Sequence, residues 1–269
     1  MKIILWSIEE VSMLEYLLLQ NCDKNSSLKE KVYYSILRNF DEDIVKVGHG
    51  LLCTQNNLAE FSNFSTSAAY LKNDLARLEL KLCQFFTSRL LEYGFEITSN
   101  PDTVRSVIAE GCGLDFRNPD EIYSLKKFQD FGDRLSCNAM HLVGGASLPA
   151  FVSYFARNIL QSSVLPVTMF CVGRHYRPES TISTCSASDK RDLVTIPQSQ
   201  AVQIFSVSQS YEDMEKQLKC ILDVVVDVFS VFPNFKLTEE TIYDCLPCNS
   251  RQFKIEMKVD IEKNYFSLM

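Results

Sequence analysis

An arginine and a glutamate stand two residues apart in the segment YRPES, at Arg177 and Glu179. A guanidinium is a permanent cation with several N–H donors, and a carboxylate accepts hydrogen bonds from amino groups. The pair could therefore form two walls of an ATP site. The other interpretation is a surface ion pair on a strand, because exposed pairs of this kind are common and contribute little to stability. Spacing alone leaves both interpretations open.

Cysteine and histidine are the residue types that could hold a metal. The ten cysteines are scattered and most have apolar neighbours, which is typical of reduced, buried thiols in an intracellular protein. One close pair, Cys245 and Cys248, has the CxxC spacing of a redox site or of half a zinc site. The histidines are His49, His141 and His175, and they supply no second ligand pair at zinc-like spacing. We therefore expect no metal site.

Length and composition restrict the class of protein. A chain of 269 residues with 46% hydrophobic content can bury one sizeable core. The net charge of −7 provides no basic field that would attract nucleic acid. No apolar run reaches the length of a membrane span. The first 20 residues carry one lysine and three glutamates, so they are not a convincing signal or transit peptide.

Periodicity predicts the elements that would position these residues. Apolar side chains recur every three or four positions over residues 67–93, which predicts a long helix ending at Gly94. Residues 95–102 then read as an extended segment, and a second helix is expected near 101–111. Strand-like runs follow at 140–145, 166–179, 196–208 and 251–261, with a further helix over 211–232. This order predicts an α+β fold with an antiparallel sheet.

Five segments together resemble the catalytic domain of seryl-tRNA synthetase, a class II aminoacyl-tRNA synthetase. They span roughly residues 58 to 257 in one collinear order and correspond to the family's first motif, its amino-acid-pocket segment, both strands of its second motif and a later acidic strand. They are LARLELKLCQFFTSRLLEYGFEITSNPDTV, HLVGGASLPAF, HYRPES, DLVTIPQSQAVQIF and QFKIEM. The resemblance implies a six- or seven-stranded antiparallel sheet flanked by helices. It also implies dimer contacts around Pro101, at the proline of the first motif.

The resemblance assigns an ATP-site role to three residues that are present. Arg177 would contact the α-phosphate and the reacting carboxylate, where charge develops in the transition state. Glu179 would receive the adenine amino group, and Glu256 would hold Mg²⁺ with the phosphates. These three residues form the expected remnant of an ATP site.

Five other positions depart from the family pattern. Thr195 replaces an arginine of the return strand, and Ser199 replaces the aromatic ring that would stack on adenine. Gly145 and Ser147 replace a threonine and a glutamate that shape the serine pocket, and Gln203 replaces the glutamate that would meet the substrate ammonium. Because selecting serine requires groups that bind its hydroxyl and its ammonium, we expect no serine pocket and poor ATP affinity.

Two further parts of the family pattern have no counterpart in the sequence. The third motif should follow QFKIEM, so the catalytic-type domain is expected to be truncated before that motif. The coiled-coil arm that grips tRNA is also missing. We therefore expect residues 1–57 to be a short helical region, a remnant of or substitute for that arm. Residues 58–269 are expected to be a class II synthetase-like domain that is incomplete at its C-terminus.

These losses resemble those of a catalytically degenerate, seryl-tRNA synthetase-like branch found in insect mitochondria. The expected function is that of an inactive paralogue in mitochondria that pairs with the active mitochondrial seryl-tRNA synthetase, or with itself. No cofactor would be required, and tRNA binding by this chain alone would be weak or absent. The alternative is an active serine–tRNA ligase that uses ATP and Mg²⁺. A third alternative, a nucleic-acid-binding module, is disfavoured by the acidic composition.

Overall fold

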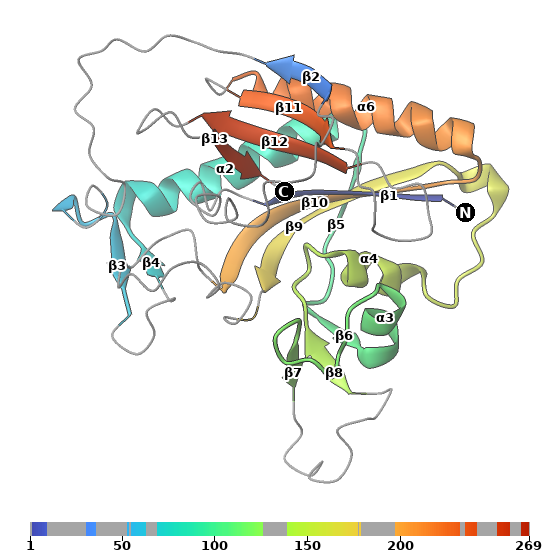
Figure 1. The fold of residues 1–269 in the computed structure, drawn as a ribbon, viewed down its shortest axis with the longest axis horizontal. Helices are drawn as coiled ribbons and strands as arrows, with labels where there is room; N and C mark the ends of the chain where they lie inside the picture. Colours follow the sequence, from blue (N-terminus) through green and yellow to red (C-terminus); the bar gives the residue numbers. More distant parts are fainter. Residues whose placement is uncertain are drawn as a thin grey trace, which may run out of the picture.

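The computed structural model describes residues 2–9, 31–35, 53, 55–62, 69–125, 139–176, 178, 197–231, 235–240, 252–258 and 265–268. Within this part of the chain, helices flank sheets that are mainly antiparallel (Figure 1). The predicted α+β class is therefore confirmed.

One four-stranded sheet, here called sheet A, contains the second-motif strands. Its order is β1-β10-β9-β5, with β1 at Lys2–Glu9, β10 at Gln198–Ser208, β9 at Val167–Tyr176 and β5 at Glu96–Thr98. Strands β9 and β10 pair antiparallel over ten residue pairs, whereas β5 runs parallel to β9. The strands predicted at 166–179 and 196–208 are thus present as neighbours.

Two long helices cover one face of sheet A (Figure 1). Helix α2 spans Asn73–Glu92 and helix α6 spans Tyr211–Phe229. The predicted stop at Gly94 is confirmed, since this residue has a φ of +79° and a backbone conformation that glycine adopts at little cost. Both helices place apolar side chains on the strands, and the resulting core includes Phe86, Leu90, Phe170, Val202, Ile204, Ile221, Val225 and Phe229.

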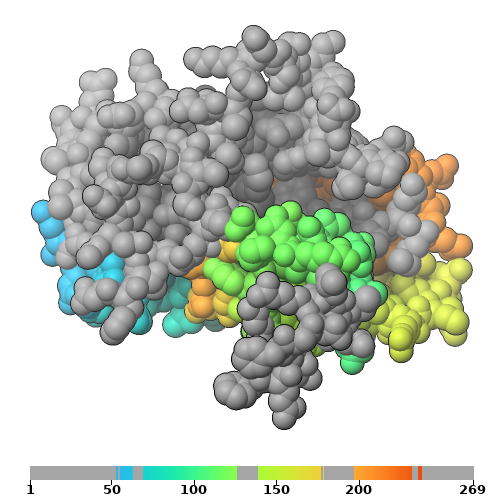
Figure 2. Space-filling model, turned by 60° about the horizontal axis from the view of Figure 1, so that its bottom comes forward, coloured from blue at the N-terminus to red at the C-terminus, as the bar shows by residue number. Residues whose placement is uncertain are grey.

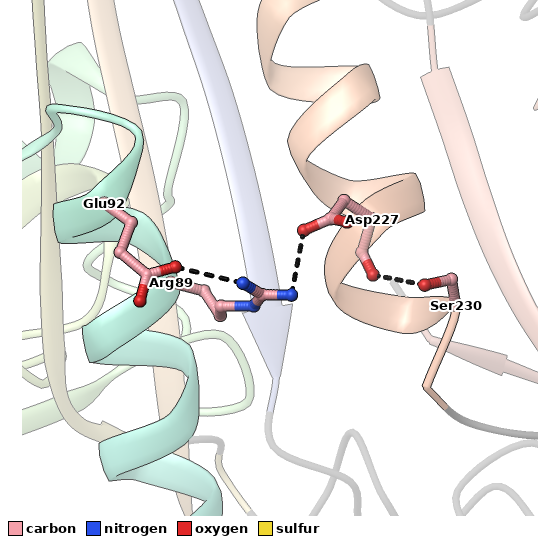
Figure 3. Close-up of polar contacts among 4 residues, drawn as sticks. All are labelled: Arg89, Glu92, Asp227 and Ser230. Atoms are coloured by element: carbon pink, nitrogen blue, oxygen red, sulfur yellow. Dashed lines mark hydrogen bonds and ion pairs between the residues drawn. The ribbon is translucent and has the colours of Figure 1, made fainter.

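An arginine joins these two helices at their surface (Figure 3). The guanidinium of Arg89 lies 3.0 Å from the carboxylate of Glu92 on α2 and 3.4 Å from that of Asp227 on α6. The hydroxyl of Ser230, just after α6, donates to the backbone carbonyl of Asp227 at 2.6 Å. Because the Arg89 and Asp227 side chains are 37% and 38% exposed, water and salt screen their attraction. The ion pair orients the helices, and the apolar core supplies the main stabilisation.

The opposite face of sheet A is covered by α4, Leu148–Phe155. Its Phe151 stacks on Phe205 of β10, and both rings are almost fully buried. The segment before α4, residues 143–147, lies on β9. This face of the sheet also holds the residues that the sequence assigns to the serine pocket.

A small three-stranded sheet and helix α3 lie beside α4. The sheet has the order β6-β8-β7, with β6 at Thr103–Arg105, β8 at Met140–Leu142 and β7 at Tyr123–Leu125, and α3 spans Ser106–Gly111. In Figure 2 this region, in green, lies at the surface next to the segment that follows α4, in yellow. The helix predicted near 101–111 therefore begins later than expected, because residues 103–105 pair with β8.

The remaining described strands form two other sheets. A second four-stranded sheet has the order β13-β12-β11-β2, with β13 at Tyr265–Leu268, β12 at Gln252–Lys258, β11 at Phe235–Glu240 and β2 at Lys31–Ser35. Strands β3, Ala59–Phe61, and β4, Ala69–Leu71, form a hairpin, and a 3₁₀ turn, η3, spans Ser162–Val164. The expected single sheet of six or seven strands is not seen among the described residues, where β1 pairs with β10 in sheet A and β12 lies in a separate sheet.

The N-terminal region differs from the expectation of short helices. Its two described strands, β1 and β2, lie in the two four-stranded sheets. Apolar residues in β1 satisfy a strand as well as a helix, and the pairing partner in β10 decides between them. The boundary at residue 57 stays a prediction. In the described part of the chain, no helix is long and apolar enough to cross a membrane.

Candidate functional site

The loop at residues 143–147 packs directly on the backbone of β9. The amide of Ala146 donates to the carbonyl of Arg174 at 3.3 Å. Gly144 has a φ of +89°, and a Cβ at this position would overlap the carbonyl of Arg174. A Cβ on Gly173 would lie 3.2 Å from the amide nitrogen of Ala146. Glycine at these positions therefore allows two backbones to approach more closely than side chains would permit.

The residues on either side of Pro101 hold the same loop from the other direction. The carboxylate of Asp102 accepts from the amide of Gly145 at 2.8 Å, and the side-chain amide of Asn100 donates to the Gly145 carbonyl at 3.1 Å. The backbone carbonyl of Asp102 also accepts from the amides of Val143 and Gly144, at 2.9 and 3.0 Å. We call Asn100, Pro101 and Asp102 the bracket. The bracket satisfies both backbone polar groups of Gly145.

Gly145 has no room for a side chain. A Cβ at this position would lie 2.7 Å from the backbone carbonyl oxygen of Asn100, closer than real Cβ atoms approach an oxygen. The obstacle is backbone, so it cannot rotate away. The threonine expected at this position from the family pattern would therefore require the bracket or the loop to move.

Ser147 and Gln203 each donate a side-chain hydrogen bond to a backbone carbonyl. The Ser147 hydroxyl, 5% exposed, donates to the carbonyl of Gly144 at 2.6 Å. The Gln203 side chain, 2% exposed, donates from Nε2 to the carbonyl of Ile204 at 3.1 Å. Gln203 lies opposite Cys171 in the β9–β10 ladder, and burial raises the pKa of that thiol. The surroundings of this thiol therefore disfavour a negative charge.

The structure places only part of the predicted nucleotide site. Ser199 lies half-buried on β10, opposite His175 of β9. Strand β9 ends at Tyr176, and Arg177, Glu179 and Thr195 lie outside the described residues, as do Cys245 and Cys248.

Glu256 is separated from this part of the site by topology. It lies on β12 of the second sheet, opposite Lys236 of β11 and Ser267 of β13, and so is not in the same sheet as Ser199 and Gln203. In the described part of the chain, no three His, Cys, Asp or Glu side chains gather in a way that could hold a metal. The magnesium role of Glu256 stays a prediction.

Pro101 is exposed, as a pairing surface would require. It follows β5, the edge strand of sheet A in the described residues, where Ile97 is 50% exposed. The sequence singled out Pro101, Gly145, Ser147 and Gln203 as expected site positions, which stay predictions, and it did not single out Asn100 and Asp102. The only available signal was their position beside a motif proline.

The comparisons with known proteins bear on the fold and on the sequence resemblance. No family model matches the chain. The solved seryl-tRNA synthetase from Pyrococcus horikoshii, crystallised with ATP, superposes with a TM-score of 0.66 at 20% identity, over 81% of this chain and 47% of that one. The fold is therefore that of a class II aminoacyl-tRNA synthetase-like domain.

In sequence, the chain is similar to seryl-tRNA synthetases and to a synthetase-like protein. The chain is 29% identical over 191 residues to the serine–tRNA synthetase-like protein Slimp of Drosophila melanogaster, covering 70% of this chain and 39% of that protein. It is 32% identical over 114 residues to the mitochondrial serine–tRNA ligase of Mus musculus, covering 41% of this chain and 20% of that protein. The resemblance seen in the motifs is thus confirmed, and the chain is seryl-tRNA synthetase-like. It spans less than half the length of each of these relatives.

Proposed function

We propose that this chain is a catalytically inactive paralogue of seryl-tRNA synthetase that acts by pairing with another protein. The observation that carries the proposal is the 2.7 Å approach of the Asn100 carbonyl to the position of a Cβ on Gly145. It supports a pocket that is filled by backbone where the family's pattern places a substrate-facing side chain. No cofactor is required for the proposed role.

The chemistry of the remaining pocket residues supports inactivity. Recognition of serine requires a group for its hydroxyl and a negative charge for its ammonium. The Ser147 hydroxyl is engaged by the Gly144 carbonyl, and Gln203 is neutral and bonded to the backbone at Ile204. Neither side chain offers a carboxylate. An amino acid that entered this space would lose water without gaining equivalent contacts.

The nucleotide side of the site supports the same function. Ser199 offers no aromatic face for adenine, a loss of about 1–3 kcal/mol by analogy with base–aromatic stacking. Thr195 cannot form the two-pronged phosphate contact of an arginine. Arg177, Glu179 and Glu256 are then inherited residues of an ATP site that no longer binds ATP tightly.

We propose the active mitochondrial seryl-tRNA synthetase as the pairing partner and mitochondria as the location. Similarity to the mouse mitochondrial enzyme and to the Drosophila synthetase-like protein supports this choice. Strand β5, which is at the edge of sheet A among the described residues and exposes Ile97, provides a suitable surface together with the exposed Pro101. An edge strand with an apolar side chain is a common site of subunit contact.

Two measurements test the proposal. Purified chain, mixed with serine, ATP and labelled pyrophosphate, should form no labelled ATP above background, while the active mitochondrial enzyme in a parallel reaction should do so. Serine-dependent exchange that resists further purification would establish the ligase alternative instead. Co-expression with the active enzyme, followed by size-exclusion chromatography, should yield a mixed dimer.

A matched pair of variants locates the surface. Ile97→Asp should weaken the mixed dimer, whereas Val164→Asp should not, because Val164 is similarly exposed, at 56%, but lies in η3 away from β5. Equal effects of the two substitutions would place the contact elsewhere on the fold. A chain that stays monomeric alone and with the enzyme would contradict pairing altogether.

A further inference from the structure

The bracket connects the edge of sheet A to the pocket loop through an unbroken series of short contacts. At the end of β5, the Thr98 hydroxyl donates to the carbonyl of Phe170 on β9 at 3.2 Å. Two residues later, Asn100 contacts Gly145 through its side-chain amide, and Asp102 contacts the same residue through its carboxylate. The loop then returns to β9 through the bond from Ala146 to Arg174.

These contacts leave the bracket little freedom to move independently of the loop. Asp102 uses both its backbone carbonyl and its carboxylate, on Val143, Gly144 and Gly145. The Asn100 carbonyl oxygen lies 2.7 Å from the position that a Cβ on Gly145 would take, so the bracket is already close to the loop and has little room to approach it further. A shift away from the loop would break several hydrogen bonds together.

Pro101 lies between the two bracket side chains and is itself exposed. Its ring fixes φ and removes an N–H donor, so the three-residue segment has few alternative conformations. A subunit that packs on Pro101 and β5 therefore contacts a segment whose neighbours on both sides hold the pocket loop.

We propose that Asn100 and Asp102 are positioning residues that couple the pairing surface at β5 and Pro101 to the loop at residues 143–147. This inference rests on the proposed pairing function. Docking of the partner subunit fixes the bracket, and the bracket fixes the loop. Coupling between two sites is reciprocal. A chain whose bracket has lost a contact to the loop should therefore also bind the partner subunit less tightly.

The bond from Asp102 to Gly145 is the one to remove, since its acceptor is a side chain. Asp102→Ala deletes the acceptor and keeps the backbone carbonyl that serves Val143 and Gly144. Asp102→Asn is the matched control, because its Oδ1 can still accept from the Gly145 amide. Asn100→Ala removes the hydrogen bond from the Asn100 side-chain amide to the Gly145 carbonyl and provides an independent second variant.

The experiment is hydrogen exchange of the chain, free and in the mixed dimer with the active mitochondrial enzyme, with the dissociation constant measured in parallel. Pairing should slow exchange at the amides of residues 143–146. Asp102→Ala and Asn100→Ala should each lose most of that slowing and weaken pairing by about tenfold, the equivalent of one hydrogen bond. Asp102→Asn should behave like the unmodified chain. A circular dichroism spectrum and a thermal melt of each free variant establish that the fold is kept.

The outcomes separate this inference from the function on which it rests. A mixed dimer whose loop amides exchange as in the free chain would overturn the coupling and leave the pairing function standing. The same holds if Asp102→Ala pairs as tightly as Asp102→Asn. Absence of any mixed dimer would overturn both.

Discussion

Phe151 of α4 and Phe205 of β10 lie face to face, with ring centroids 5.1 Å apart and ring planes 3° from parallel. Both side chains are almost fully buried, and Phe155 adds a third ring 5.6 Å from that of Phe205. The stack attaches α4 to sheet A, and α4 begins directly after the loop at residues 143–147. The position of the loop therefore depends on an aromatic core directly beneath it.

Phe151→Ala should accordingly lower the free energy of unfolding by about 3–5 kcal/mol, because it removes a buried ring and leaves a cavity. Urea denaturation followed by circular dichroism measures the change. Tyr154→Ala is the control: this ring is 59% exposed on the same helix, so its loss should cost about 0.5 kcal/mol or less. Similar losses for both variants would mean that α4 is not anchored by the stack.

Gly145→Ala should destabilise the fold by about 1–3 kcal/mol, because the new methyl group would stand against the Asn100 carbonyl. Gly145→Thr should cost more and should restore no serine-dependent pyrophosphate exchange. Gly111→Ala provides the matched control, since nothing lies within 4 Å of its Cβ position and its φ is not positive. Gly111→Ala should be neutral or stabilising by a few tenths of a kcal/mol. A neutral Gly145→Ala would show that the bracket yields easily.

Local sequence patterns predicted those helices and strands whose packing or pairing neighbours lie close to them along the chain. The end of α2 at Gly94 and the β9–β10 pair were identified, because a glycine stop and two apolar runs are visible without tertiary knowledge. The start of α2 was placed at residue 67, but the helix begins at Asn73. Residues 69–71 instead form β4 and pair with β3. Helix propensity alone does not show that a strand partner is available for these residues.

The site shows the same division. Gly145 and Gln203 were singled out as candidates because they replace residue types that the family's chemistry needs. Asn100 and Asp102 were missed because their role lies in contacts to a loop more than forty residues away along the chain. Neither their types nor their spacing resembles a catalytic pattern. Only the fold brings them to Gly145.

Stability should fall between pH 7.5 and pH 5.5 through His141. This side chain is 1% exposed, with Nε2 2.8 Å from the Ser106 hydroxyl and Nδ1 3.1 Å from that of Ser124. The Ser106 hydroxyl also donates to the Ala139 carbonyl, so the arrangement suits a neutral ring that donates from Nε2. Burial lowers the pKa of His141.

The sign follows from linkage. A lowered pKa in the folded state means that the unfolded chain binds the proton more readily, so this contribution to stability is full above about pH 6.5 and is lost as the pH falls below it. Urea unfolding at both pH values measures the effect. His141→Gln should reduce the pH dependence in this window while His49 and His175 remain. An unchanged dependence in the variant would assign it to other groups.

Gln203→Glu should destabilise the protein at neutral pH, even though it restores the residue type of the family pattern. The new carboxylate would lie at a 2% exposed position opposite Cys171 and between Val202 and Ile204. Burying a carboxylate at this position should cost about 3 kcal/mol, and burial would raise the pKa of the carboxyl. The loss should therefore diminish as the pH falls and the group is protonated. Gln203→Met, similar in length and uncharged, should show no such recovery at low pH. If Gln203→Glu were as stable as the unmodified chain at pH 7.5, a cation or water would have to reach this position, and the pocket would be open to a substrate ammonium after all.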